Sequence, residues 1–152
     1  RSYSLRGHTP VVRVNHNRHG CSVISTVTNR GEMRWMVFKG ALDSSILIGF
    51  LRRLVKDSDS KVFLILDNLR VHHSKPVKGW LADHVDLIEV FYLPSYSPEL
   101  NPVEVANAAT KHAPARKKGQ LELVTSRFLR SLQRRPKRII ALFQKDTVRY
   151  AA

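Results

Sequence analysis

Hydrophobic and polar positions along the chain predict β-strands separated by helices. Residues 21–28 alternate polar with β-branched side chains, and residues 33–38 follow after the turn-forming segment Asn29-Arg30-Gly31-Glu32, which together predict a hairpin. Residues 62–66 form a short continuous apolar run, typical of a strand buried on both faces, and residues 88–93 predict a second buried strand. Strands interleaved with helices indicate an α/β fold.

Helical spacing of apolar residues fills the intervals between and after these strands. Asp43 is a favourable N-cap, and Pro76 is tolerated in the first turn of its helix. Asn101-Pro102 predicts the start of another helix, because asparagine favours the N-cap and proline the first helical position. Besides the helix that begins at Asn101-Pro102, the predicted helices cover residues 43–56, 74–84, 121–132 and 137–144.

Two carboxylates lie at the ends of these predicted elements, one after a strand and one in the first turn of a helix. Asp67 follows the run of residues 62–66, and the carboxyl end of a buried strand is where open α/β sheets place ligand-binding and catalytic groups. The alternative is an aspartate that caps the following turn. The prolines of residues 94–102 make a rigid loop that delivers Glu104 on the first turn of the next helix. Two carboxylates without a nearby cation in the sequence favour a divalent metal ion as counter-charge.

The residues around these carboxylates resemble a known family. Residues 67–74 read Asp-Asn, three residues, His, one residue and Ser, and residues 93–104 read LPSYSPELNPVE. This combination resembles the DDE endonuclease domain of mariner-like transposases, in particular the branch found in bacterial insertion sequences. The resemblance is specific over residues 67–104 and extends as a looser pattern over about residues 7–152.

The resemblance implies an RNase H-like mixed sheet flanked by helices, in which three acidic residues hold two Mg²⁺ or Mn²⁺ ions. In that family the ions drive DNA strand cleavage and strand transfer, with in-line attack by water or a 3′-hydroxyl and no covalent protein intermediate. Asp67 matches the second acid and Glu104 the third, so both are expected to be catalytic residues and metal ligands. They are separated by 36 residues, within the range of such families.

Three further residues are expected to support this site. Asn68 would hold the Asp67 loop or lie near the metal, and Asn107 lies one turn beyond Glu104 on the same predicted helix face. His72 matches the family's histidine and would orient Asp67 or approach a phosphate; the alternative is a histidine that makes only local hydrogen bonds.

The family's first acid has no match in this sequence. In the family it lies on the first strand, upstream of the part that residues 7–14 resemble, and the single acidic residue within residues 1–42 is Glu32, in the predicted hairpin turn. The first strand is central to the sheet. Without it we expect two unpaired strand edges in the middle of the fold, unless residues 11–14 or another segment replace it. We therefore expect this chain alone to cleave DNA weakly or not at all.

Charge adds a nucleic-acid partner to this picture. The chain has 26 Lys and Arg against 12 Asp and Glu, a net charge of +14. The excess lies at both flanks, whereas residues 43–104 hold seven basic and nine acidic side chains. This layout favours DNA as the partner, both transposon ends and target; charge kept for solubility alone is the alternative.

Four cations downstream of Glu104 are the candidates for contact with the DNA backbone. The alternative is that these residues form a solvated loop without a DNA contact. They are Lys111, Arg116, Lys117 and Lys118. We expect residues 1–113 to form a partial catalytic core, and residues 114–152 a basic helical extension that ends at the family's usual carboxyl terminus.

The remaining features bound the class of protein. The length of 152 residues and the 43% of apolar residues suit one domain with a core. With no long apolar run and no signal-peptide pattern, we expect a bacterial cytoplasmic protein without membrane contact, and a homodimer as its assembly. Cys21 is the only cysteine, which excludes an internal disulfide. The expected function is that of a DDE transposase catalytic domain; the alternatives are an RNase H-like nuclease and a non-catalytic basic nucleic-acid-binding remnant.

Overall fold

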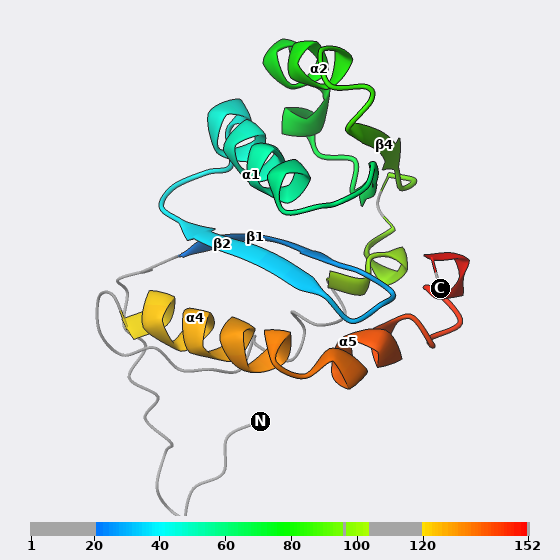
Figure 1. Cartoon of the computed structure of the whole chain (residues 1–152). Coiled ribbons are helices and arrows are strands. Elements are labelled where there is room, and N and C mark those ends of the chain that lie inside the picture. The colour runs from blue at the N-terminus through cyan, green and yellow to red at the C-terminus, as the bar shows by residue number, and fades with distance from the viewer. Residues whose placement is uncertain (1–20, 96, 104–119, 152) are drawn as a thin grey trace, which may run out of the picture.

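The structure is a computed structural model that describes residues 21–95, 97–103 and 120–151 (Figure 1). Residues 11–14, which we expected as a possible replacement for the first strand, lie outside the described residues. The strands and helices are, in chain order, β1 (Ser22–Val27), β2 (Met33–Phe38), α1 (Ser44–Lys56), β3 (Val62–Leu66), α2 (Lys75–Ala82), β4 (Ile88–Tyr92), α4 (Gln120–Gln133) and α5 (Pro136–Leu142). Short 3-10 helices are η1 (Arg70–His73), η2 (Pro98–Leu100) and η3 (Arg149–Ala151).

The described strands form two separate two-stranded sheets. β1 and β2 pair antiparallel with Ile24 opposite Met36, which confirms the predicted hairpin. β3 and β4 pair parallel with Leu64 opposite Val90, and α2 provides the crossover that parallel neighbours need. Parallel and antiparallel pairs are therefore both present, as expected for a mixed sheet, but no strand in the described part of the chain joins the two sheets.

Helices cover the β1–β2 sheet on both faces, with α1 on one side and α4 on the other (Figure 1). α1 begins where the sequence predicts, because Oδ1 of Asp43 accepts a 2.8 Å hydrogen bond from the N–H of Ile46. α2 ends at Ala82, two residues before the predicted end, where the chain tightens into a turn. None of the described helices has the length and apolar character needed to cross a membrane.

Two hydrophobic clusters lie on opposite sides of the β1–β2 sheet. Successive residues of β1 divide between them, as alternate strand residues must, because Ile24 packs against the first cluster and Val23 against the second. The first cluster contains Leu47, Leu51, Leu64, Val77, Trp80 and Ile88, and the second contains Met33, Leu129, Leu132, Ile139, Phe143 and Val148. The helices near the carboxyl end therefore belong to the core of the molecule.

The expectation that β3 is buried on both faces is wrong. Leu64 is 7% exposed, but Phe63 is 65% exposed and Ile65 is 42% exposed. α1 and α2 pack on the face that carries Leu64, and neither hydrophobic cluster includes the two exposed residues. An apolar run identifies a strand, whereas the number of its covered faces depends on neighbours that are distant in sequence.

The hairpin turn between β1 and β2 packs closely on the start of α5. Gly31 has φ +89°, a left-handed conformation that glycine adopts without a steric penalty. A Cβ added at Gly31 would lie 2.7 Å from the Cβ of Pro136. Gly40 has a similar φ of +83°, but no atom lies within 4 Å of the corresponding position.

Candidate functional site

Asp67 directly follows β3, at the edge of the sheet where the strand ends. Its side chain is 44% exposed and borders a cavity of about 560 Å³. No Lys or Arg of the described residues forms an ion pair with its carboxylate. The carboxyl end of a parallel strand is the usual location for a ligand-binding group, and this carboxylate is open to such a ligand.

His72 connects Asp67 to the interior of the molecule. It is 3% exposed, and its Nδ1 lies 2.6 Å from the main-chain oxygen of Asp67 and 3.3 Å from the carboxylate Oδ1. Both partners are acceptors, so Nδ1 carries the proton and donates it toward them. His72 therefore holds both the backbone and the carboxylate of Asp67 in one orientation.

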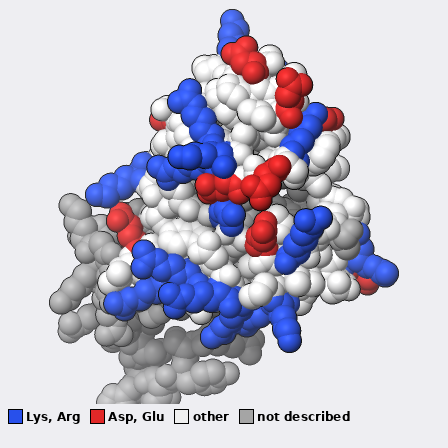
Figure 2. All heavy atoms as spheres, viewed as in Figure 1, with Lys and Arg blue, Asp and Glu red and all other residues white. Residues whose placement is uncertain are grey.

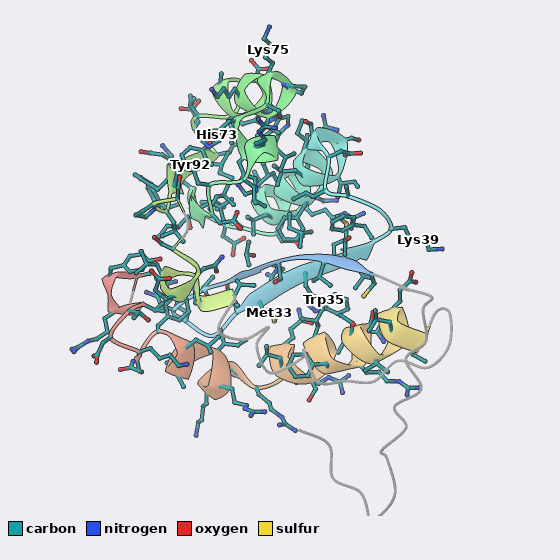
Figure 3. The ribbon with its side chains drawn as sticks, turned by 180° about the vertical axis from the view of Figure 1, so that it is seen from behind. Met33, Trp35, Lys39, His73, Lys75 and Tyr92 are labelled. Carbon is teal, nitrogen blue, oxygen red and sulfur yellow. The ribbon has the colours of Figure 1, made fainter. Side chains whose placement is uncertain are left out.

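A second set of contacts joins the loop after β3 to the end of β4. Asn68 donates from Nδ2 to Oγ of Ser95 at 2.9 Å, and its Oδ1 contacts Nε2 of His73. The ring of His73 lies beside that of Tyr92, with centroids 4.5 Å apart (Figure 3). The hydroxyl of Tyr92 in turn reaches the main-chain oxygen of His72 at 3.4 Å. The loops that follow β3 and β4 therefore hold one another in place.

The cavity beside Asp67 lies between the two sheets. Consecutive residues 23–27 of β1 and 63–66 of β3 line it, together with the residue that follows each strand. Since successive side chains of a strand point to opposite faces, a cavity lined by consecutive residues borders the strand edges. β1 is paired only with β2 and β3 only with β4 within the described residues. These are the two unpaired edges that the sequence led us to expect in the middle of the fold.

The loop after β4 brings a second helix start to the same cavity. The N–H of Val103 donates to Oδ1 of Asn101 at 2.9 Å, and residues 102 and 103 are helical, which confirms the predicted N-cap. Asn101, Pro102, Val103 and Asp67 all line the cavity. Residues that are 34 or more positions apart in sequence thus meet at one site.

Tyr150 in η3 holds this loop from the far end of the chain. Its hydroxyl donates to the main-chain oxygen of Leu100 at 2.9 Å, immediately before the Asn101 cap. The residue is 51% exposed, but partial burial raises the pKa of the Tyr150 hydroxyl above its ordinary value of 10.0. The carboxyl-terminal segment therefore stabilises the loop that leads to Glu104.

Several predicted site residues lie outside the described residues: Glu104, Asn107, Lys111, Arg116, Lys117 and Lys118. Within the described residues, no group of three His, Cys, Asp or Glu side chains is placed to hold a metal ion. Asp67 supplies one carboxylate, the ligand type that Mg²⁺ and Mn²⁺ prefer. This carboxylate fits a hard divalent cation. A complete metal site would need further ligands from outside the described residues.

Sequence reasoning missed the contacts of Tyr92, Ser95 and Tyr150. Ser95 stands beside Pro94 in a loop, which indicates a turn and gives no sign of a partner at Asn68. The tyrosines lie at the end of a strand and among the last residues of the sequence, where a hydroxyl that needs a hydrogen-bond partner is the single signal that the sequence offers.

Residues 1–120 match a protein-family model described as "DDE superfamily endonuclease". A search of curated proteins found no match.

Solved structures of similar fold include the "Mos1 transposase paired-end complex with left transposon end", with a TM-score of 0.58 and 18% identity over 93% of this chain and 49% of that chain. The "Mos1 mariner paired end complex with Mn" has a TM-score of 0.57 and 21% identity over 92% and 49%. The "Mos1 Strand Transfer Complex" has a TM-score of 0.57 and 19% identity over 96% and 50%. This likeness confirms the expected RNase H-like fold class. The chain spans about half the length of these structures.

Proposed function

We propose that this chain, which belongs to the DDE superfamily endonucleases, is part of the catalytic domain of a transposase that cuts and joins DNA strands. The similar folds are transposase complexes, two of them paired-end complexes and one a strand-transfer complex. Transposon-end and target DNA as partners, and assembly as a homodimer, belong to this proposal. So do a bacterial insertion-sequence origin and a cytoplasmic location.

One observation carries the proposal: Asp67 and the residues just before Glu104 line the same cavity. Asn101 caps a helix that begins with Pro102, and Glu104 lies two positions further along the sequence. We assign Asp67 and Glu104 as catalytic carboxylates and metal ligands for Mg²⁺ or Mn²⁺. The exposed carboxylate of Asp67, which has no Lys or Arg partner among the described residues, supports a cationic ligand there.

The proposed roles of the neighbouring residues are to position this site. Divalent ions, when bound, activate the attacking oxygen and stabilise the leaving oxygen of an in-line phosphoryl displacement. His72 donates to Asp67 and fixes its orientation, so that the carboxylate needs little reorganisation to bind a cation. Asn68 keeps the adjoining loop in place through Ser95, and Asn107 is proposed to support Glu104.

The cavity between β1 and β3 is proposed to receive the family's first strand, with the remaining acid at its end. Neither strand is paired at its cavity side by any other described strand, so an inserted strand would pair with each. In this proposal residues 1–113 form the catalytic core, and residues 114–152 form a helical extension whose α4 and α5 pack against the β1–β2 sheet. The proposed contacts with the DNA backbone are Lys111, Arg116, Lys117 and Lys118.

A titration with divalent metal tests the site. The thermal stability of the purified chain is measured against Mg²⁺ and Mn²⁺ at constant ionic strength, together with Asp67→Ala and Glu104→Ala. Metal that binds only the folded chain stabilises it by about 1.4 kcal/mol when the free ion is at ten times its Kd. We expect this stabilisation in the parent chain and in Asp59→Ala, a control at an exposed carboxylate, and its loss in the other two variants.

Cleavage of supercoiled plasmid tests the enzymatic part. Two-metal chemistry needs a full set of ligands for both ions, and the family's first acid has no match in this sequence. We therefore expect the chain to nick DNA weakly or not at all in Mg²⁺. Robust nicking that Asp67→Ala abolishes would contradict the proposed need for a further acid while supporting the assignment of Asp67.

The second candidate function is a non-catalytic basic module that binds nucleic acid. It is favoured by the net charge of +14, which suits a surface that binds phosphates. This candidate predicts steep salt dependence of DNA binding and no effect of Mg²⁺ on stability, and the same metal titration separates it from the enzyme.

A further inference from the structure

A row of cations follows the outer side of α4 and continues into α5. Arg127 and Arg130 share one face of α4, and Arg134 continues this spacing one residue beyond the helix end, where its N–H donates to the main-chain oxygen of Arg130. All three are exposed. Leu129 and Leu132 lie on the opposite face and are buried against Met33. We call the exposed set the α4–α5 basic face; it consists of Arg127, Arg130, Arg134, Arg135, Lys137 and Arg138.

The basic face is continuous and free of acids. Figure 2 shows Lys and Arg gathered in a band over α4 and α5. None of its six cations forms an ion pair with a carboxylate of the described residues. No acidic residue occurs between Glu122 and Asp146 in the sequence. Uncompensated like charges at this spacing repel one another, so a polyanion bound to this face would relieve a real electrostatic cost.

The chemistry of the face points to phosphates. Five of the six cations are arginines, and one planar guanidinium group can donate two parallel hydrogen bonds to the oxygens of a phosphate. With a rise of about 1.5 Å per residue, Arg127 and Arg134 are about 10 Å apart along the helix axis. That distance is about three nucleotide steps of one DNA strand, at roughly 3.4 Å each. A row of this length can follow consecutive phosphates.

The surroundings of the face argue against a membrane as the anionic partner. A helix that lies in a membrane surface needs an apolar face available for insertion. The apolar face of α4 is occupied by the core, and none of the large exposed apolar residues lies between Arg127 and Arg138. Phosphates of a nucleic-acid backbone need no such insertion.

We infer that the α4–α5 basic face binds the phosphate backbone of duplex DNA without regard to sequence, at a site separate from Asp67. The β1–β2 sheet lies between α4 and α1 (Figure 1), and Asp67 directly follows β3, whose Leu64 belongs to the hydrophobic cluster on the α1 side of that sheet. The inference shares its partner, DNA, with the proposed function but needs no metal.

The test is the binding of a fluorescein-labelled 20-bp duplex of arbitrary sequence, followed by anisotropy over a range of salt concentrations in EDTA. The face variant is Arg127→Gln, Arg130→Gln, Arg134→Gln. The matched control removes the same charge from exposed lysines of α1 and α2, as Lys56→Gln, Lys75→Gln, Lys78→Gln. A third variant, with the three arginines replaced by lysine, keeps the charge and checks that α4 still folds.

Each lost phosphate contact reduces the slope of log K against log salt by about 0.9. We expect the face variant to lower the magnitude of that slope by about 2 to 3 and to weaken binding on the order of 100-fold at 0.1 M salt. The control triple and Asp67→Ala should keep the slope of the parent chain, and the lysine variant most of it.

Three outcomes would overturn the inference. If the face variant binds as the parent does, α4 takes no part in binding. If the control triple weakens binding equally, net charge alone is responsible. If the face variant loses binding to vesicles of phosphatidylserine and phosphatidylcholine but not to the duplex, the partner is a membrane. Because metal is absent throughout, failure here leaves the metal titration of Asp67 untouched.

Discussion

Asn68 donates a 2.9 Å hydrogen bond to Ser95, across 27 positions, and so links the residue beside Asp67 to the loop that follows β4. Both side chains are exposed, so the contact orders the loops more than it stabilises the fold. It is a direct connection between the two segments that the proposed site needs, beside the contact of Tyr92 with His72.

Asn68→Ala and Ser95→Ala should each lower the free energy of unfolding by about 0.5 to 1 kcal/mol, near the low end for a hydrogen bond because water replaces an exposed partner. The double variant should lose less than the sum of the two, since both remove the same bond. Urea denaturation measures all three. Ser97→Ala is the control, because its hydroxyl lies 3.5 Å from the main-chain oxygen of Ser95, at the limit of a hydrogen bond. Full additivity would mean that the two side chains act independently.

His72→Ala should weaken Mg²⁺ or Mn²⁺ binding by 10- to 100-fold, as is typical when a residue that orients a metal ligand is removed. Isothermal titration of the ion gives the affinity directly. His72→Asn retains a donor near Nδ1 and should recover much of that affinity. A purely structural histidine predicts otherwise: both variants would melt earlier by the same amount with and without metal, at unchanged affinity.

Tyr150 makes the stability of the chain depend on pH in the alkaline range. Its pKa is raised by burial, so the folded chain holds the hydroxyl proton more tightly than the unfolded chain does. The contribution of Tyr150 is therefore full below pH 10 and is lost as the pH rises through the raised value, where the phenolate no longer donates to Leu100.

Tyr150→Phe removes both the hydrogen bond and this proton. At pH 8 it should be less stable than the parent by about 0.5 to 1 kcal/mol, and the difference should shrink as the pH passes 10. Urea denaturation of both chains at pH 8, 9, 10 and 11 measures this. If the difference in free energy of unfolding between the two chains stays constant across that range, folding does not change the pKa of the Tyr150 hydroxyl.

Gly31 and Gly40 form a matched pair for testing the contact between the hairpin turn and α5. Both have positive φ, so alanine at either position introduces strain of about 1 to 2 kcal/mol. Gly31→Ala also forces a methyl group against Pro136, whereas Gly40→Ala meets open space. Gly31→Ala should therefore be the more destabilising by at least about 1 kcal/mol in urea denaturation. Equal losses would mean that α5 can move away from the turn freely.

Local sequence signals predicted the elements that frame the site. The run that becomes β3 is bounded by polar residues on both sides, and its predicted limits match the observed Val62–Leu66. Asp43 and Asn101 cap their helices with side-chain oxygens, as short-range propensities indicate. These signals succeed because each depends on residues within a few positions of one another.

Contacts between distant segments could not be predicted in the same way. The hydrogen bond from Tyr150 to Leu100 joins residues 50 positions apart, and the sequence pattern around either residue gives no indication of the other. The exposure of Phe63 likewise depends on which elements stand beside β3. The pairing of Asp67 with Glu104 rests on the family resemblance and stays a prediction.

Among the described strands, β1 and β3 each have one unpaired edge, and this also bears on how the chain behaves in concentrated solution. A strand edge that presents free backbone donors and acceptors beside bulky apolar side chains such as Phe63 and Ile65 is a template for other molecules of the same kind. Solutions of the isolated chain should therefore form aggregates rich in intermolecular β-structure as the concentration rises. Phe63→Lys, a gatekeeper substitution at an exposed position, should keep the chain monomeric.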